Sequence, residues 1–503
     1  MSYEDFSEGR CMVKQSSAKR PLVKLLSTEF IERIIEEAKD VLEKTGVWVE
    51  NKEGLELLGN GGARIDRGKE KAFIPKRLVE ESLKSVPSSI MTYDRNGNPH
   101  MNFDGNNSYF CSGGDALRVW DSDLGQLREP LTEDQIKYVK LVDALDDIDA
   151  QGAALVVTDV PKEIMDRYQI FAFLRYSTKP HFAGTHSKEG FQVIKDLLVT
   201  IRGSEKALRD KPLDWFAICP SPPLKWSDLL CHDLMRCAQN GIPAVITPMP
   251  LTGSTGPITM GGSIVQATAE HLSGVVISQL AGRGAPLIWG TGPLAFDMRW
   301  GTTPFSAIES IMMSMACCEV GKYLGLPTRT YVGCSDAKCP DSQAGLETGI
   351  GTILPTLAGI NLIINSGMLN FESAQSLEKL VIDNEICGMA RRLVQGITPR
   401  GEQLAEDLFT EGLYEGKHFL LSPATMKWFR EEFFYPGPVI SREDDQVWAE
   451  KGATTAEQRA KEEVKRILAT HEPEPLDKDI DRELLRIITK EAEKYGMSKL
   501  PLP

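Results

Sequence analysis

The stretch "RTYVGCSDAKCPDSQAGLETGIGTILPTLAGINLIINSG", Arg329 to Gly367, contains the smallest unit of the fold. It begins with a short apolar and β-branched run, continues through a polar loop into a helical pattern, and closes on a second apolar run, "INLIINSG". This order predicts a strand, a helix and a second strand.

The same alternation occurs eight times from about residue 106. Its apolar runs are "SYFCSGGD" from Ser108, "AALVVTD" from Ala153, "PHFAGTH" from Pro180, "WFAICPS" from Trp215, "PAVITPMP" from Pro243, "PLIWGTG" from Pro286, "RTYVGCSD" from Arg329 and "INLIINSG" from Ile360. In the first helical pattern, "LTEDQIKYVKLVDAL", Thr132 and Gln135 have the spacing of a capping box. Eight strand-helix pairs predict an α/β protein of the (β/α)8 or TIM-barrel type. An open doubly wound sheet is the alternative, but its usual phosphate turns, GxGxxG and GxxxxGK[ST], are absent.

The first and last hundred residues lack this alternation. Residues 26–45 and 75–86 have helical patterns on either side of a predicted hairpin, so residues 1–105 are expected to form a cap on a barrel of residues 106–396. Residues 397–503 are expected to form a helical extension, in which two charged amphipathic helices flank the linker "EPEPLD". Their alternating charges are typical of a solvated face rather than of a partner site.

The composition excludes several classes of protein. Lys and Arg number 57 against 71 Asp and Glu, a net charge of −14, which argues against a general nucleic-acid binder and leaves room for a cationic ligand. The acidic start has no apolar signal core, and the most apolar region, "HLSGVVISQLAGRGAPLIWG", is interrupted by polar residues, so a cytoplasmic chain is expected. Ten scattered cysteines without a CxxC pair suit a reducing compartment.

In a barrel of this type the active site lies at the carboxyl ends of the strands. The polar and aromatic residues at the predicted strand ends are Ser112, Gly113, Asp115, Thr158, Asp159, Thr185, His186, Cys219, Met249, Trp289, Thr291, Phe296, Asp297, Arg299, Trp300, Tyr331, Cys334, Ser335, Asp336, Lys338 and Asn365.

Four features at these ends have competing interpretations. The loop "GTGPLAFDMRWGTTPF" offers aromatics that suit a quaternary ammonium and Arg299 that suits a carboxylate, or else Arg299 forms a surface ion pair. Lys338 is either a Schiff-base nucleophile or the ion-pair partner of Asp336. The cysteines and histidines lack the tight pair of a zinc site, so no metal is predicted. Gln343 and Glu347 share one helical face and fit a tether for the preceding loop better than a substrate contact.

Five segments, by their order and spacing, indicate a known family: "VLEKTGVWVEN", "FAICPSPPLKWSD", "GSTGPITMGGSIVQATAEHLSGVVISQL", "SDAKCPDSQAGLETGIGTILPTLAGINLI" and "SLEKLVIDNEICGMARRLVQGI". Together they resemble the trimethylamine methyltransferase (MttB) superfamily along essentially the whole chain. The resemblance implies a (β/α)8 enzyme that gives a methyl group from an N-methylated amine to the Co(I) centre of a separate corrinoid protein. A cobalamin-binding D-x-H-x-x-G motif is absent, with Gly184 in place of the Asp in "GTHSKEG". The cobalamin is therefore expected on a partner that docks over the barrel mouth.

The resemblance also bears on the substrate. The archaeal trimethylamine enzymes of the superfamily carry pyrrolysine just before the segment similar to "SDAK", at a position that corresponds to about Gly333 here. The chain thus resembles the non-pyrrolysine branch, whose characterised members demethylate quaternary amines such as glycine betaine. Such an amine is already cationic and leaves as a neutral tertiary amine, so an SN2 transfer needs orientation and desolvation but no strong base.

Strand-end placement and chemistry suggest roles for individual side chains. Arg299 is expected to pair with the substrate carboxylate, and aromatic residues are expected to enclose the trimethylammonium group. Gly333 is expected to leave the pocket floor open and Asp336 to supply a counter-charge. The predicted substrate-binding residues are Phe296, Arg299, Trp300, Tyr331 and His186.

Three alternatives stay open. The same chemistry on proline betaine, carnitine or γ-butyrobetaine is compatible with the sequence, which gives no pocket volume. A non-catalytic quaternary-amine binding protein would bind ligand without methylating Co(I), and a Schiff-base lyase would use Lys338. The family likeness and the helical ends predict a homo-oligomer, and no nucleic-acid or membrane partner is expected.

Overall fold

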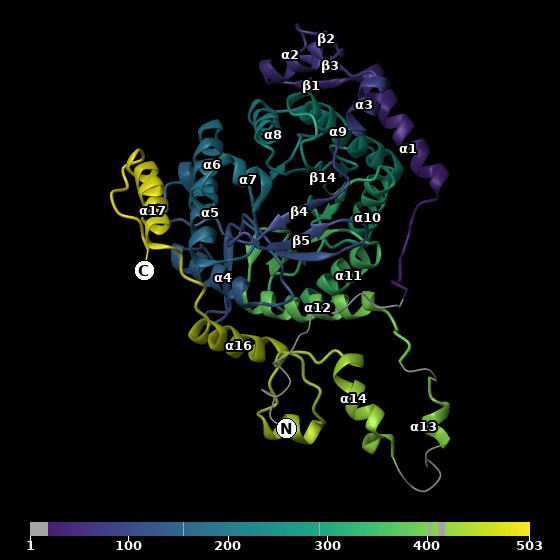
Figure 1. Ribbon diagram of the computed structural model, residues 1–503, viewed down its shortest axis with the longest axis vertical. Coiled ribbons are helices and arrows are strands. Elements are labelled where there is room, and N and C mark those ends of the chain that lie inside the picture. The colour runs from purple at the N-terminus through teal and green to yellow at the C-terminus, as the bar shows by residue number, and fades with distance from the viewer. Residues whose placement is uncertain (1–18, 154, 291, 401–403, 411–417, 503) are drawn as a thin grey trace.

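A computed structural model describes residues 19–153, 155–290, 292–400, 404–410 and 418–502 (Figure 1). Eight short parallel segments form its centre. They are β6 (Tyr109–Ser112), residues 150–151, β9 (His181–Ala183), β10 (Asp214–Ile218), β12 (Ala244–Ile246), β14 (Leu287–Trp289), β16 (Arg329–Thr330) and β17 (Leu362–Ser366).

The eight segments close into a ring. Parallel pairing runs from β9 through β10 and β12 to β14, and from β16 through β17 to β6. The bridge from Trp289 to Thr328 joins the two sheets on one side, and residues 150–151 join them on the other. This closure is that of a (β/α)8 barrel and confirms the predicted fold class.

The second strand differs from the prediction. It lies at residues 150–151, before the apolar run that begins at Ala153, and the chain leaves the ring at Gly152. A Cβ atom on Gly152 would lie only 2.1 Å from the carbonyl oxygen of Gly113, because the loop after β6 crosses the chain there. Ala153, Leu155 and Val157 in the following run are buried, and Leu155 makes an isolated bridge to Ala116, so the hydrophobicity of these residues reflects burial.

Helices surround the ring on its outside (Figure 1). They are α4 (Thr132–Ala144), α5 (Met165–Tyr176), α6 (Lys188–Arg202), α8 (Asp228–Asn240), α9 (Met260–Ala281), α10 (Ile308–Tyr323), α11 (Ser342–Leu357) and α12 (Leu377–Gln395). A serine hydroxyl caps the start of three of them, at Ser187, Ser227 and Ser376. Between these elements lie the 3-10 turn Lys162–Ile164, α7 (Glu205–Asp210) and β11 (Lys225–Trp226).

The capping box predicted for the first barrel helix is wrong. The side-chain oxygen of Thr132 donates a hydrogen bond to Asp159 instead of capping α4, and Gln135 accepts one from the amide of Leu155. The carboxylate of Asp134 accepts the amide of the residue before the helix. Both predicted capping residues therefore connect α4 to the loop after the second strand.

The N-terminal residues pack against α9. They form α1 (Thr28–Asp40), the π-helical turn Val41–Thr45, α2 (Lys52–Asn60), α3 (Lys76–Leu83), and the strands β1 (Val47–Val49), β2 (Arg64–Asp66) and β3 (Lys71–Phe73). Helices α1, α2 and α3 all contact α9, which is consequently buried on nearly every side. Among the described residues, no helix combines the length and the apolar character that a membrane crossing needs.

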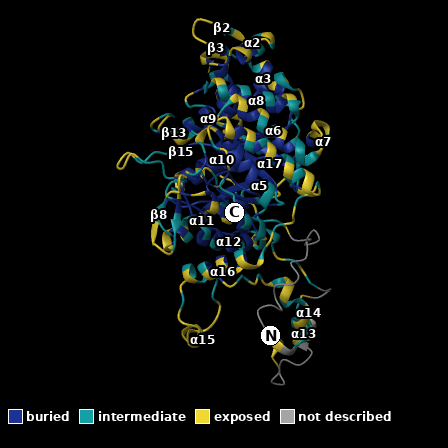
Figure 2. Cartoon of the chain, turned by 90° about the vertical axis from the view of Figure 1, so that its left-hand side faces the viewer, coloured by how far each residue is buried: buried dark blue, intermediate teal, exposed yellow. Residues whose placement is uncertain are grey.

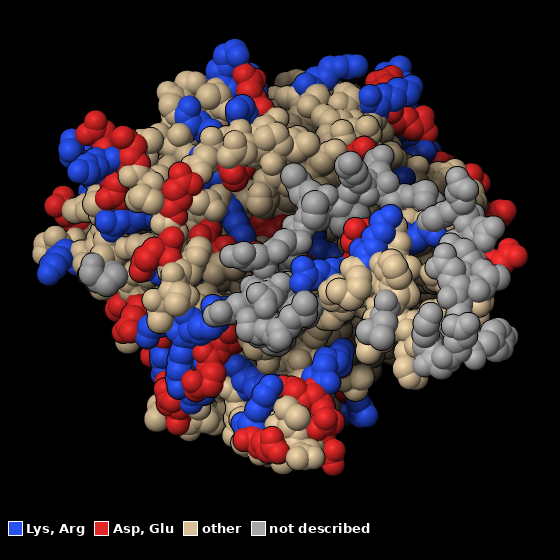
Figure 3. Space-filling view, turned by 60° about the horizontal axis from the view of Figure 1, so that its bottom comes forward, with Lys and Arg blue, Asp and Glu red and all other residues tan. Residues whose placement is uncertain are grey.

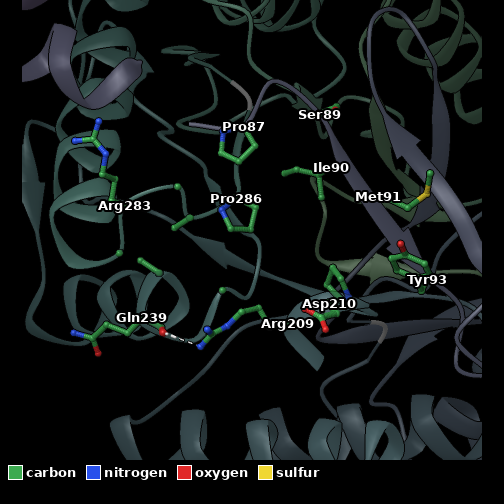
Figure 4. A pocket seen from close by; sticks show the side chains of 16 residues that line it. Pro87, Ser89, Ile90, Met91, Tyr93, Arg209, Asp210, Gln239, Arg283 and Pro286 are labelled. Carbon is green, nitrogen blue, oxygen red and sulfur yellow. Dashed lines mark hydrogen bonds between the residues drawn. The ribbon is translucent and has the colours of Figure 1, made fainter. Parts of the chain in front are cut away.

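A hairpin closes the amino-terminal end of the barrel. It consists of β4 (Ile90–Tyr93) and β5 (Pro99–Phe103), and the ring of Phe103 meets Trp215 edge-on at 6.1 Å. A cavity of about 530 Å³ lies between this hairpin and the turns that lead into β10, β12 and β14, with Pro87 and Pro286 in its walls (Figure 4). The carboxyl ends of the strands are at the opposite end of the barrel, so this cavity is not where the fold places its chemistry.

The C-terminal helices brace the outside of the barrel. Helix α16 (Ala456–Thr470) packs on α12 and α4, while α17 (Lys478–Glu493) packs on α5 and α6, and each buries an apolar stripe. Between α12 and α16, α13 (Glu406–Thr410), the 3-10 turn Phe419–Leu421, α14 (Pro423–Glu432) and α15 (Asp445–Glu450) project from the body (Figures 1 and 2). On the face shown in Figure 3, basic and acidic side chains are interspersed, a pattern that does not favour a polyanion.

A buried ion pair joins the last two barrel helices to the loop after β17. Lys379 Nζ lies 2.5 Å from Asp383 Oδ2, and both side chains are buried. Lys379 also donates to Thr348 of α11, and Asp383 accepts the amide of Gly367 at 2.6 Å. The pair therefore fixes the start of a loop that carries part of the candidate site.

Replacing Lys379 by Met should lower the free energy of unfolding by about 3–5 kcal/mol, because Asp383 would stay buried without its cation. Lys461→Met, which breaks a pair with the exposed Asp123, is the matched control and should change little. Chemical denaturation followed by circular dichroism measures both, and equal losses would contradict the role of the buried pair.

Candidate active site

The loops after the barrel strands are ordered by small sheets of their own. After the fifth and sixth strands, β13 (Leu251–Thr252) pairs with β15 (Leu294–Ala295). After the first and eighth strands, a second sheet combines β7 (Arg118–Asp121), β8 (Gln126–Arg128), β18 (Met368–Leu369) and β19 (Ala374–Gln375). These pairings give fixed positions to side chains at the carboxyl end of the barrel, which is the end that supports catalysis.

Five side chains at or just inside this end of the barrel influence one another through their charges and are called the mouth cluster: Asp115, His186, Cys219, Arg329 and Glu372. The charges of Arg329 and Asp115 act on Glu372, and His186 acts on Asp115. Cys219 lies within the electrostatic reach of Arg329, Glu372 and Asp115. The members come from five different strands or strand-end loops, as is typical of a barrel active site.

The two carboxyls of the mouth cluster share surroundings, here called the recess, in which protein encloses a group that still has exposed surface. Burial raises the pKa of Glu372 to about 7, although the Asn365 amide and the Arg329 charge act to lower it. Burial also raises the pKa of Asp115. Yet Asp115 keeps exposed surface and Glu372 is only half-buried. Protein surrounds both groups while water still reaches them, which is the environment of an acid site suited to a cation.

The backbone that presents these carboxyls adopts a conformation that most side chains avoid. Asn370, Phe371 and Glu372 have φ values of 52°, 57° and 63°, while Asp115 and Asn365 have 57° and 87°. Each left-handed residue costs on the order of 1–3 kcal/mol, and consecutive ones are unusual. Such strain persists only where neighbouring contacts hold it, and it concentrates at functional sites.

Two contacts from the segment "SDAK" hold the strained turn 370–372. The carbonyl of Ala337 accepts the amide of Asn370 at 2.8 Å, and Lys338 Nζ lies 3.9 Å from the centre of the Phe371 ring. Lys338 also donates to the carbonyl of Asp336. These contacts give Lys338 a positioning role and do not support a Schiff base.

Helix α11 holds the same segment from its other side. The Ser335 hydroxyl and the Asp336 amide both donate to Glu347 Oε2, at 2.6 and 2.8 Å. Gln343 donates to the other oxygen of Glu347 at 2.9 Å. Gln343 and Glu347 therefore tether the preceding loop, as their spacing in the sequence predicts.

Asp336 and Gly333, for which a counter-charge and an open pocket floor are predicted, have other neighbours in the structure. The carboxylate of Asp336 accepts the amides of Phe305 and Ser306, at 3.1 and 3.0 Å, and burial raises its pKa to about 6. A Cβ atom on Gly333 would meet the carbonyl oxygen of Ile364 at 2.7 Å, so this glycine allows the chain after β16 to approach β17 closely.

The predicted substrate-binding residues fall into two groups. Tyr331 lies near Arg329, with its hydroxyl donated to the carbonyl of Gly292, and His186 belongs to the mouth cluster. Phe296 is half-buried in the loop after β15. Arg299 instead pairs with Asp297 at 2.6 Å on an exposed tip, where Trp300 is 79% exposed. The structure therefore supports the surface ion pair for Arg299 and does not bring it or Trp300 to the recess.

Arg329 and Glu372 are the site residues that the strand-end list misses. Arg329 is the first residue of its strand, whereas the list collects residues at the carboxyl ends of strands. Glu372 follows the end of β17 by several residues. A charged residue two positions before Tyr331, on the same inward face of a strand, was the available signal for Arg329.

Thiol and metal chemistry find little support in the described residues. No group of three His, Cys, Asp or Glu side chains there could hold a metal ion. Burial raises the pKa of Cys219 to about 11 and that of Cys334 well above its usual range, so neither supplies a thiolate near neutral pH.

The closed ring and the mouth cluster define a (β/α)8-barrel enzyme with its site at the carboxyl ends of the strands. The family model described as "Trimethylamine methyltransferase (MTTB)" matches residues 5–496. The chain belongs to this family and is a methyltransferase of the corrinoid-dependent class.

Relatives match over nearly their whole lengths. The trimethylamine methyltransferase MttB of Desulfitobacterium hafniense is 29% identical over 460 residues, 92% of each chain. The glycine betaine methyltransferase of D. hafniense strain Y51 is 27% identical over 478 residues, 95% of this chain and 98% of that protein. The crystal structure of the Methanosarcina barkeri monomethylamine methyltransferase (MtmB) aligns over 96% of each chain at 12% identity, with a TM-score of 0.47.

The raised pKa of Glu372 has a measurable effect on stability. The folded state binds this proton more tightly than the unfolded chain, whose Glu pKa is about 4.3, so stability from this group falls as pH rises from about 4.5 to 7. Glu372→Gln should remove that fall. The free energy of unfolding of the variant, relative to that of the wild type, should therefore be higher at pH 8 than at pH 5. Urea unfolding at both values tests it, with Glu431→Gln in the projecting α14 as control, and a pH-independent difference would contradict the buried carboxyl.

Proposed function

We propose that this chain transfers a methyl group from a quaternary amine, with glycine betaine as the first candidate, to the Co(I) centre of a corrinoid on a partner protein. The tertiary amine, dimethylglycine, is released. The observation that carries the proposal is the pair of carboxyls, Glu372 and Asp115, in a recess at the barrel mouth. A glycine at the position corresponding to pyrrolysine and a similar protein named for glycine betaine support the same substrate class.

A trimethylammonium group suits this recess because it donates no hydrogen bonds and is held by charge and apolar contact. Glu372 and Asp115 supply the negative charge. The positive charge on nitrogen disappears as the methyl group leaves, so a full-strength ion pair would favour the substrate over the transition state. Carboxyls whose pKa values are raised limit that penalty.

The chemistry asks little of the chain beyond binding and orientation. The C–N bond breaks while a carbon–cobalt bond forms with the electron pair of Co(I), and nitrogen keeps the C–N pair as a neutral amine. No proton is transferred. The mouth cluster would hold the amine with one methyl group toward the opening and limit competing poses and water.

The acceptor would arrive over the mouth, where an apolar rim is exposed. The rim consists of Ile258, Met298 and Trp300, which are 68%, 63% and 79% exposed. The pairing of β13 with β15 brings their loops together, and Ile258 and Met298 meet above Gly253. Exposed side chains of this size in one patch are typical of a protein contact. Figure 2 shows exposed segments beside β13 and β15.

A spectroscopic assay of methyl-Co(III) formation from Co(I) tests the substrate. Glycine betaine should react, and Glu372→Gln should lower kcat/KM at least tenfold, about 1.4 kcal/mol, because the recess loses negative charge. Proline betaine, carnitine, γ-butyrobetaine and trimethylamine complete the panel. Activity with trimethylamine and with none of the betaines would refute the proposal.

The apolar rim predicts a separate effect on the partner. Trp300→Ala should lower the rate of methyl transfer to a corrinoid protein about tenfold and leave binding of glycine betaine unchanged, because the rim lies outside the recess. Phe433→Ala, at an exposed apolar site beyond α14, is the matched control. A loss of betaine affinity in Trp300→Ala would return this residue to the substrate site.

A further inference from the structure

A guanidinium group is buried inside the barrel with one hydrogen-bond partner among the residues that the structure describes. Arg329 is 4% exposed, and its Nη1 donates to the Thr247 hydroxyl at 3.0 Å. Its Nε atom is buried and makes no hydrogen bond to any described residue. Arginine offers five donors and keeps its charge in proteins, so an arrangement that satisfies so few of them is costly.

The surroundings of Arg329 place the group in the barrel interior. Its guanidinium lies 5.6 Å from the ring of Phe182 on β9, while Thr247 directly follows β12. β9 lies across the ring from β16, and β12 lies two strands away from it. None of the ion pairs found among the described residues includes Arg329, although the charge of Glu372 acts on it from a greater distance. The cation thus has open donors and no counter-ion in contact.

We propose that Arg329 is the anion subsite of the recess and binds the carboxylate of the substrate. This inference rests on the proposed function and narrows it to zwitterions, in which a quaternary ammonium and a carboxylate are joined by a short spacer. The carboxylate fills the open donors of the guanidinium in the manner that arginine favours. The ammonium end then lies toward Glu372 and Asp115, on the loops beyond the strand ends.

This orientation agrees with the position of each group along the barrel. Arg329 belongs to the strand itself, whereas Glu372 and Asp115 follow β17 and β6 on the mouth side. A bound zwitterion therefore points its carboxylate inward and its methyl groups outward, to the opening where an acceptor arrives. Choline, which has the same ammonium group and a hydroxymethyl group in place of the carboxylate, leaves the guanidinium without an anionic partner.

Isothermal titration of the chain without a partner separates the two ends of the ligand. The probes are glycine betaine, choline, and 3,3-dimethylbutyrate, which keeps the carboxylate and replaces the ammonium nitrogen by carbon. Arg329→Gln should weaken glycine betaine by about thirtyfold and abolish binding of 3,3-dimethylbutyrate, while choline changes less than about threefold. Arg329→Lys should recover part of the loss. Arg299→Gln, on the exposed tip, is the matched control and should not affect any probe.

Unchanged glycine betaine affinity in a folded Arg329→Gln protein would overturn the inference. If that variant does not fold, the wild-type panel still decides, because the subsite predicts at least about tenfold tighter binding of glycine betaine than of choline. Equal affinities would refute it. Carboxylate-dependent binding without any methyl transfer would leave the subsite standing and refute the proposed function alone.

Discussion

The site depends on the buried positive charge of Arg329, which forms no ion pair with any residue that the structure describes. The ring places the Arg329 guanidinium in the barrel interior, and its one side-chain hydrogen bond among the described residues goes to Thr247. An isolated buried charge is among the most costly features a fold can hold. On the proposal above, a ligand offsets this cost by placing an anionic group against the guanidinium. The same ligand then carries a cationic group for Glu372 and Asp115.

The acidic side depends in turn on a strained backbone with two supports. The left-handed turn 370–372 is held by the segment "SDAK", and its loop begins at Gly367, which the buried pair of Lys379 and Asp383 fixes. The polar residues after β16 are thus scaffold for the neighbouring loop. Their density in the sequence comes from the number of contacts needed to hold consecutive residues in an unfavourable conformation.

The sequence predicts the barrel because alternating apolar runs and helical patterns are local signals, whereas the second strand is misplaced because the close crossing at Gly152 is a tertiary effect. For the site, the strand-end rule finds Asp115, His186, Cys219, Tyr331 and Asn365. It does not find Glu372, whose position is set by a left-handed turn. The sequence does not distinguish Arg299 from Arg329, because both are arginines close to predicted barrel strands. The fold shows that Arg299 pairs with Asp297 on the surface and that Arg329 is buried and donates to Thr247.

A crystal structure of the chain with glycine betaine tests the central claim most directly. The account predicts the carboxylate within hydrogen-bonding distance of the Arg329 guanidinium, the trimethylammonium group beside Glu372 and Asp115, and the methyl groups directed to the mouth. A betaine bound to Arg299 on the exposed tip, or in the cavity lined by Pro87 and Pro286 at the other end of the barrel, would contradict it.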